Sequence, residues 1–200
     1  MSAIEVASHP LVRRLADSLG ARARLEATPG PTDKRAAVAL ILRLGADDEL
    51  ELLLIKRANY EGDPWSGHVA LPGGRREDAD PSLEVTAIRE TREETGIDLV
   101  AHGRILGALD DLQPRTPRLP PLVITPFVAV LEHDAALVLS DEVASAFWVK
   151  LASLQDPAMS RTVEIELPDI RITERAFSFD EHVIWGLTER ILRQFLALIS

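Results

Sequence analysis

The sequence predicts an α/β fold, an α/β/α sandwich in which helices cover both faces of a central mixed sheet. Apolar residues recur at helical spacing near both ends of the chain and in one charged segment near its middle. Aliphatic runs bounded by Gly, Pro and Asp lie between these segments, and such runs are typical of strands. Because helices and strands do not alternate regularly, the sheet should contain both parallel and antiparallel pairs.

The first half of the chain is expected to begin with an amphipathic helix. Leu11, Leu15 and Leu19 recur at helical spacing there, and Gly30-Pro31 then ends the pattern. Two aliphatic runs separated by the turn residues 45–48 predict an antiparallel hairpin. The expected elements are a helix over 10–25, strands over 36–44 and 50–55, and an irregular stretch over 59–74.

A second helix is expected in the charged segment. Asp80-Pro81 favours its start, since Asp accepts hydrogen bonds as an N-cap and Pro suits the first helical position. Gly96 is the matching stop. The residues expected to face the core are Leu83, Ala87, Ile88 and Thr91, and those expected on the other sides are Glu90, Arg92, Glu93 and Glu94. This helix therefore presents one strongly acidic face.

The second half of the chain is expected to add strands and a last helix. Its expected elements are strands over 97–109 and 123–131, a proline-rich connection over 110–121, a short strand over 147–149, further strands over 161–179, and a helix over 184–199. Leu187, Ile191 and Phe195 give the last segment its helical spacing. These elements complete the set that an α/β/α sandwich needs.

Composition excludes several classes of function. The formal charge is -10, with 22 basic and 32 acidic residues, which disfavours a nucleic-acid partner because phosphate neutralisation needs clustered cations. The absence of cysteine excludes disulfides and thiolate chemistry. No secretory signal and no membrane-spanning run is visible, so a cytoplasmic protein without membrane partners is expected, as a monomer or a homodimer.

The acidic face of the charged helix predicts a metal site. Glu90 lies three residues from Glu93 and four from Glu94, so the three carboxylates can converge on one face. Carboxylate oxygens suit Mg2+ or Mn2+, which bind phosphate oxygens and activate water. The alternative is a solvated face on which these acids pair with Arg89 or Arg92.

The segment that contains these acids resembles the Nudix box. That motif is a Gly, an acid after five residues, then Arg-Glu, two residues, Glu-Glu, one residue, Gly and an aliphatic. The matching residues are Gly74, Arg89, Glu90, Glu93, Glu94, Gly96 and Ile97. The first acid is Asp80 instead of Glu, and eight residues separate it from Arg89. The resemblance implies a Nudix-type α/β/α sandwich over residues 34–200, preceded by a helical extension over 1–33.

Other residues resemble the coenzyme A pyrophosphatase branch of this family, in which Asp and the longer spacing also occur. The segment Leu53–Asn59 is similar to a motif of that branch, which reads Leu-Leu-Thr, any residue, Arg-Ser-Ala. Three further segments are also similar: Gly67 with Leu71-Pro72-Gly73-Gly74, Asp141-Glu142-Val143, and Ile184–Thr188. Ile55 replaces the Thr, Leu71 replaces a Phe, and Asp63 stands where an Arg is expected. These departures leave other substrates open.

The resemblance implies a role for each site residue. Glu90, Glu93 and Glu94 would ligate the cations, and one of them or a further carboxylate would serve as base. Arg89 would orient a glutamate, unless it forms only a surface ion pair. The glycine pair would let the backbone approach the pyrophosphate, and Arg57 would contact phosphate, unless the glycines form an ordinary turn and Arg57 merely ends a strand.

Two aromatic residues near the box are open to two interpretations each. Trp65 could stack on a base or pack under its loop. His68 could contact phosphate or be structural.

Three functions follow from the resemblance. The first is hydrolysis of coenzyme A or acyl-CoA to 3',5'-ADP and 4'-phosphopantetheine with Mg2+ or Mn2+. The second is hydrolysis of ADP-ribose, dinucleotides or nucleoside triphosphates, since the box acts on any pyrophosphate. The third is a non-catalytic module that senses a nucleotide.

Overall fold

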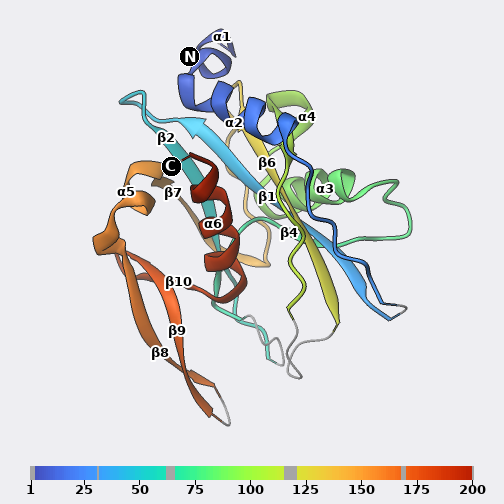
Figure 1. Cartoon of the computed structure of the whole chain (residues 1–200), viewed down its shortest axis with the longest axis vertical. Helices are drawn as coiled ribbons and strands as arrows, with labels where there is room; N and C mark the ends of the chain where they lie inside the picture. Colours follow the sequence, from blue (N-terminus) through green and yellow to red (C-terminus); the bar gives the residue numbers. More distant parts are fainter. Residues whose placement is uncertain (1–2, 31, 62–65, 115–120, 168–169, 200) are drawn as a thin grey trace.

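The computed structural model describes residues 3–30, 32–61, 66–114, 121–167 and 170–199. Figure 1 shows the arrangement of its elements. In chain order they are α1 (Ala3–Ser8), α2 (Pro10–Ala21), β1 (Lys34–Leu44), β2 (Leu50–Arg57), β3 (Val69–Ala70), β4 (Gly73–Arg75), α3 (Leu83–Thr95), α4 (Leu99–His102), β5 (Gly103–Ala108), β6 (Leu122–Leu131), β7 (Val143–Lys150), α5 (Leu151–Gln155), the 3-10 helix η1 (Pro157–Met159), β8 (Ser160–Leu167), β9 (Ile170–Phe179), β10 (His182–Trp185) and α6 (Gly186–Ile199).

The central sheet is mixed, as the sequence predicts. Its order is β3-β2-β1-β6-β5, with β4 also paired to β1 and β7 also paired to β2. β1 lies parallel to β6 and antiparallel to β2, which confirms the expected hairpin. Near its end β1 pairs Leu42 with Leu52 of β2, and near its start it pairs Ala37 with Gly74 of β4. Two strands, β2 and the short β4, therefore share one edge of β1, and the glycine pair lies in β4.

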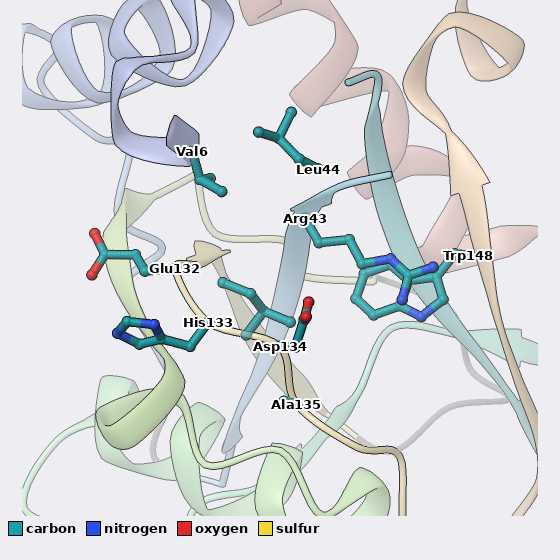
Figure 2. A pocket seen from close by; sticks show the side chains of 9 residues that line it. Val6, Arg43, Leu44, Glu132, His133, Asp134, Ala135 and Trp148 are labelled. Atoms are coloured by element: carbon teal, nitrogen blue, oxygen red, sulfur yellow. The ribbon is translucent and has the colours of Figure 1, made fainter. Parts of the chain in front are cut away.

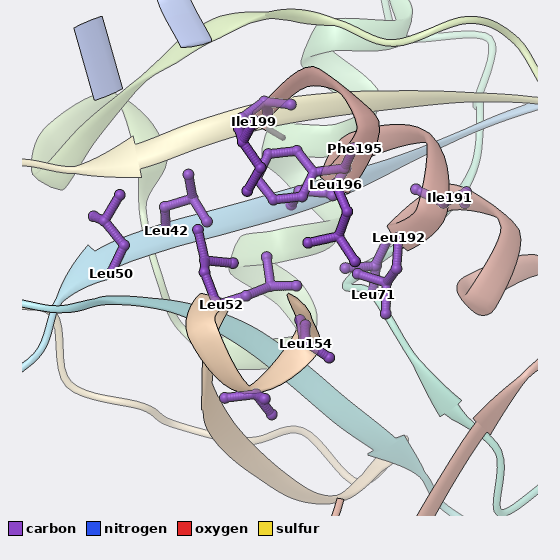
Figure 3. Packing of buried hydrophobic residues seen from close by; sticks show 14 of the residues in the cluster. Leu42, Leu50, Leu52, Leu71, Leu154, Ile191, Leu192, Phe195, Leu196 and Ile199 are labelled. Atoms are coloured by element: carbon purple, nitrogen blue, oxygen red, sulfur yellow. The ribbon is translucent and has the colours of Figure 1, made fainter. Parts of the chain in front are cut away.

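Helices cover both faces of this sheet. Because side chains alternate along a strand, Leu40 and Leu42 face one side of the sheet and Ala39 and Ile41 face the other. The first side carries the largest cluster of buried apolar residues, to which α2 and α6 contribute, as Figure 3 shows for Phe195 and its neighbours. The second side packs against α3 and α4. The expected α/β/α sandwich is confirmed.

The start of α3 differs from the expected one. The helix begins at Leu83, and its N-cap is Ser82, whose hydroxyl accepts a hydrogen bond from the backbone N–H of Val85 at 3.2 Å. The carboxylate of Asp80, which was the expected cap, instead accepts hydrogen bonds from Arg89, Thr86 and the backbone N–H of Glu77. Gly96 ends the helix in the left-handed conformation, with φ of 75°, as predicted.

The segment 97–109, which was expected as one strand, contains a helical turn before the strand. Asp98 caps α4 by accepting hydrogen bonds from the backbone N–H groups of Val100 and Ala101. Leu99 is buried, whereas Val100 and Ala101 are both exposed, so the apolar run does not alternate as a strand would. The strand β5 begins only at Gly103.

Other boundaries also differ. α2 ends at Ala21 and not at residue 25, and the stretch 59–74 contains the short strands β3 and β4. β7 is longer than the expected 147–149. Residues 184–185 belong to β10, so the last helix starts two residues later, at Gly186.

The residues before β1 pack on the same core as the rest of the chain. Val12, Leu15 and Leu19 of α2 belong to the cluster that contains α6. The segment after α2 is held by Asp110, which pairs with Arg22 and accepts a hydrogen bond from the backbone N–H of Leu25. None of the helices in the described ranges has the length and apolar character needed to cross a bilayer.

The strands β8, β9 and β10 form a second, three-stranded sheet. Figure 1 shows the β8–β9 hairpin projecting away from the rest of the molecule. Its base packs on α6, where the guanidinium of Arg193 lies 4.7 Å from the ring centre of buried Phe177. The strands expected within 161–179 are therefore present.

Candidate active site

The glycine pair of β4 places two carboxylates of α3 against the sheet. The backbone N–H of Gly73 donates a 2.8 Å hydrogen bond to Glu94 Oε2. A side chain on Gly73, whose φ is 150°, would put its Cβ 2.3 Å from the carbonyl oxygen of Ala37. A Cβ on Gly74 would lie 2.5 Å from the carboxyl carbon of Glu90. At Gly73 the clash is with the backbone of β1, so only glycine fits there, whereas a side chain on Gly74 would displace the Glu90 carboxylate from its place against β4.

Gly73→Ala should therefore destabilise the protein by at least about 2 kcal/mol, since both the clash and the positive φ oppose a side chain. Gly20→Ala is the matched control. Gly20 is exposed in α2 with no other group near its Cβ position, so alanine there should raise the stability slightly. Urea unfolding of both variants tests this. Equal stability of Gly73→Ala and wild type would contradict the role of the close approach.

Arg89 is the centre of a hydrogen-bond network at the start of α3. Its guanidinium donates two hydrogen bonds to the carboxylate of Asp80, at 3.1 and 3.0 Å, and a third to the carbonyl oxygen of Arg75 at 3.0 Å. Its Nη1 lies 3.1 Å from Glu90 and 2.9 Å from Glu93. The planar fork of donors thus links the loop after β4 to two carboxylates of the helix.

Asp80 is the main anchor of this network. Its side chain is only 4% exposed, and it also accepts hydrogen bonds from the hydroxyl of Thr86 and the backbone N–H of Glu77. The hydrogen bonds from Arg89 hold the pKa of Asp80 well below its ordinary value. The sequence analysis treats Asp80 as an N-cap. Its place in the motif, as the acid that precedes Arg89-Glu90, is the feature of the sequence that could have identified it as the partner of Arg89.

Glu94 is a buried carboxylate. Its side chain is 5% exposed, so the sequence-based expectation that it projects away from the core is wrong. Burial raises the pKa of Glu94 to about 7, in spite of the hydrogen bond from Gly73. Burial also raises the pKa of Glu90, against the opposing effect of Arg89. Two adjacent carboxylates of this kind favour a bound cation.

Glu142 is a third carboxylate near this pair. Its negative charge contributes to the raised pKa of both Glu90 and Glu94. The segment before it is fixed to the end of α3, because the backbone N–H of Ser140 donates to the carbonyl oxygen of Glu94 at 3.1 Å. Only the similarity of 141–143 to one branch pointed to this residue in the sequence, since it lies far from the box.

The remaining predicted site residues lie around these carboxylates. Glu93 is 57% exposed and turns toward Arg89. Arg57, at the end of β2, has its Nη1 3.9 Å from Glu94. The structure thus brings Arg57, Gly73, Gly74, Glu90 and Glu94 together, and Glu93 stands apart on the Arg89 side. Within the described part of the chain, His, Asp and Glu side chains do not form a group of three close enough to share a metal ion.

Other residues that the sequence singled out do not contact the carboxylates or lie outside the described part of the chain. His68 packs its ring 4.7 Å from that of Trp185. Trp65 and residues 115–120 of the proline-rich connection lie outside the described residues. The pocket in Figure 2 lies at the far end of β1 from the glycine pair, and Arg43 stacks there 3.9 Å from the ring centre of Trp148. That pocket is separate from the carboxylates.

The model of the NUDIX domain matches residues 33–167, which is more than half of the chain. The chain belongs to the Nudix hydrolase family. The glycine pair and α3 lie within the matched residues, and the segment that resembles the Nudix box folds there as a strand, a loop and a helix.

Two relatives support this assignment. An uncharacterised protein of Schizosaccharomyces pombe is 36% identical over 158 residues, which cover 70% of this chain and 48% of that protein. The chain thus spans about half the length of the yeast relative. The uncharacterised Nudix hydrolase NudL of Yersinia pestis is 30% identical over 171 residues, covering 84% of this chain and 81% of that protein.

Two solved structures have a similar fold. A MutT/Nudix family protein from Enterococcus faecalis is similar with a TM-score of 0.58 and 23% identity, over 86% of this chain and 64% of that one. The Ap4A hydrolase of C. elegans in a binary complex is similar with a TM-score of 0.55 and 22% identity, over 83% of this chain and 97% of that one. At these identities the similarity shows the fold alone.

Proposed function

We propose that this Nudix hydrolase cleaves the pyrophosphate bond of coenzyme A or an acyl-CoA with a divalent cation, which gives 3',5'-ADP and 4'-phosphopantetheine. The observation that carries the proposed chemistry is the buried carboxylate of Glu94 beside Glu90 and Glu142. Their mutual repulsion and the loss of hydration favour a positive charge at this place.

The donor set fits a hard divalent cation. All the candidate donors are carboxylate oxygens, which Mg2+ and Mn2+ prefer, and the low exposure of Glu94 explains why a neutralising charge is favourable there. Glu90, Glu93 and Glu94 would hold the cation, and rotation of the flexible Glu93 side chain away from Arg89 would bring it to the other two. The bound cation would offset phosphate charge and lower the pKa of the attacking water.

The protein's own groups position this chemistry. The N–H of Gly73 fixes Oε2 of Glu94, and the other carboxylate oxygen, Oε1, lies 3.9 Å from Nη1 of Arg57. Arg89 holds Glu90 and Glu93 through one nitrogen while Asp80 fixes the rest of its guanidinium. Glu90, Glu93 or the nearby Glu142 would take the proton from the attacking water. Arg57, which lies beside Glu94, would contact a phosphate oxygen of the substrate.

The choice of coenzyme A is supported by one segment outside the box and by the residue spacing within it. The Leu53–Asn59 segment is β2 with its following turn, and it delivers Arg57 to the carboxylates. The eight-residue spacing between Asp80 and Arg89 is accommodated by the turn that places Asp80 under the guanidinium. Both features belong to the motifs that resemble the coenzyme A pyrophosphatase branch.

A product-resolved hydrolysis assay tests the proposal. The protein would be given coenzyme A, acetyl-CoA, ADP-ribose, NADH and nucleoside triphosphates separately, each with Mg2+ or Mn2+. We expect release of 4'-phosphopantetheine from coenzyme A or acetyl-CoA at the highest kcat/KM. Preference for another substrate would show that the departures from the coenzyme A motifs at Leu71 and Asp63 go with a different substrate specificity. A protein that binds nucleotides but cleaves none of these substrates would be a sensor.

A further inference from the structure

Two segments that are distant in sequence run side by side next to the carboxylates. The backbone N–H of Ala58, just after β2, donates a 2.8 Å hydrogen bond to the carbonyl oxygen of Glu142. Two residues later, the phenol hydroxyl of Tyr60 donates a 2.9 Å hydrogen bond to the carbonyl oxygen of Asp141. The residue before Glu142 and Glu142 itself are thus both tied to the 58–60 segment.

Tyr60 is held firmly although its side chain is largely exposed. Its backbone N–H donates to the hydroxyl of Ser66 at 2.8 Å, and that hydroxyl donates to the carbonyl oxygen of Tyr60 at 2.7 Å. The residue remains 48% exposed, so its ring contributes little to the core. An exposed aromatic residue that is fixed at its backbone and at its hydroxyl is suited to holding another segment in place.

The turn that carries Glu142 is anchored on its other side by α3. Val138 and Ser140 donate backbone hydrogen bonds to the carbonyl oxygens of Thr95 and Glu94, at 2.8 and 3.1 Å. Val143 closes the turn by donating to Ser140 at 3.1 Å. These bonds fix residues 138–140, whereas residues 141 and 142 are fixed from the side of β2. The hydrogen bond from the hydroxyl of Tyr60 to Asp141 is a side-chain contact that fixes the turn from the side of β2.

We infer that Tyr60 is a positioning residue, whose hydroxyl fixes the turn at 140–142 and so sets the place of the Glu142 carboxylate relative to Glu90 and Glu94. This inference rests on the proposed cation-dependent hydrolysis, because Glu142 matters to the reaction only if the carboxylates serve it. The ring of Tyr60 need not touch the substrate. Its effect on the reaction passes through Glu142.

A double-mutant cycle tests this inference. Tyr60→Phe removes the hydroxyl and keeps the ring, Tyr60→Leu removes both, and Glu142→Gln removes the charge that Tyr60 positions. The two readouts are the Kd for Mn2+ in the absence of substrate and the kcat and KM on the substrate that the assay above finds to be cleaved best. Tyr60 is the only tyrosine in the chain, so the substitutions leave no second phenol to compensate.

We expect Tyr60→Phe to lower kcat and to weaken Mn2+ binding, each by about fivefold, as expected for the loss of one net hydrogen bond. The KM of Tyr60→Phe should stay within about twofold of the wild-type KM. When Tyr60→Phe is added to Glu142→Gln, the kcat, KM and Kd for Mn2+ should stay within about twofold of those of Glu142→Gln alone. The melting temperature should change by no more than a few degrees, since the bond is at the surface. A purely structural role would not produce the dependence on Glu142.

Three results would overturn the inference. Unchanged kcat and Mn2+ affinity in Tyr60→Phe would show that the hydroxyl positions nothing. An equal loss of kcat and Mn2+ affinity on Tyr60→Phe substitution in wild type and in Glu142→Gln would show that the hydroxyl does not act through Glu142. A raised KM in Tyr60→Leu with normal Tyr60→Phe would make the ring a substrate-stacking surface. Failure of the proposed function is a separate outcome, seen as a wild-type protein that binds no Mn2+ and cleaves no pyrophosphate.

Discussion

Glu94→Gln should lower turnover by roughly 10^3-fold, because losing a cation ligand removes several kcal/mol of transition-state stabilisation. The shape of the side chain is kept, and the amide oxygen can still accept the hydrogen bond from Gly73. The loss should therefore appear in kcat on the preferred substrate and in the Kd for Mn2+. A variant with near-normal kcat would exclude Glu94 as a ligand.

The same variant should be more stable than wild type when no cation is bound. The pKa of Glu94 is raised in the folded protein to about 7, so the folded state holds this proton more tightly than the unfolded chain does. The fold is therefore favoured below pH 4.5, loses stability between about pH 4.5 and 7 as the buried group ionises, and stays lower above that range. The difference is at most about 3 kcal/mol. Glutamine does not ionise and escapes this loss.

Thermal unfolding with a chelator measures this stability effect. At pH 8 the melting temperature of Glu94→Gln should exceed that of wild type, and the difference should shrink as the pH falls toward 5. Exposed Glu84 on the same helix supplies the control, because Glu84→Gln removes an acid that is not buried. A lower melting temperature of Glu94→Gln at pH 8 would contradict the cost that we assign to this buried charge.

Arg89→Ala should damage both stability and activity. The buried carboxylate of Asp80 would lose its two strongest donors and keep only the hydroxyl of Thr86 and the backbone N–H of Glu77. Removing one partner of a buried ion pair typically costs about 3 kcal/mol or more. Turnover should also fall, since Glu90 and Glu93 lose the group that orients them.

Urea unfolding at pH 7 and steady-state kinetics measure these two effects. Arg92→Ala is the matched control, because Arg92 lies on the same helix with an exposed side chain. The double variant Asp80→Asn, Arg89→Ala should recover part of the lost stability, since it leaves no uncompensated charge, and should not recover activity. Wild-type stability in Arg89→Ala would show that Asp80 does not depend on this arginine.

The sequence predicts the sandwich because its strongest patterns are local. Continuous aliphatic runs in β1 and β2, and the helical spacing of α6, suffice to identify these elements as buried strands and an amphipathic helix of one core. The start of α3 could not be predicted in this way. Asp80, the expected N-cap, instead binds Arg89 nine residues along the chain, and Ser82 caps the helix.

The candidate site could be predicted in part for the same reason. Spacing along α3 identifies Glu90, Glu93 and Glu94, but it cannot show that Glu94 is buried or that Arg89 draws Glu93 aside. Glu142 and Tyr60 are brought together by a backbone hydrogen bond from Ala58 and a side-chain hydrogen bond from Tyr60, which join segments about 80 residues apart in the chain. Residue spacing in the sequence contains no information about such contacts. Their positions follow from the tertiary structure alone.

The shared edge of β1 also has a consequence for the order of folding. β1 pairs in parallel with β6, whose residues follow it by almost 90 positions, while β4 completes the opposite edge next to the carboxylates. Closing so long a loop is entropically costly, and parallel pairing between distant strands is slow. α3 packs on both strands, because Ala87 shares a buried cluster with Ala37 of β1 and Phe127 of β6, so catalytic competence should arise late in folding. Recovery of activity after dilution from denaturant would then report the last step of refolding and not the first collapse.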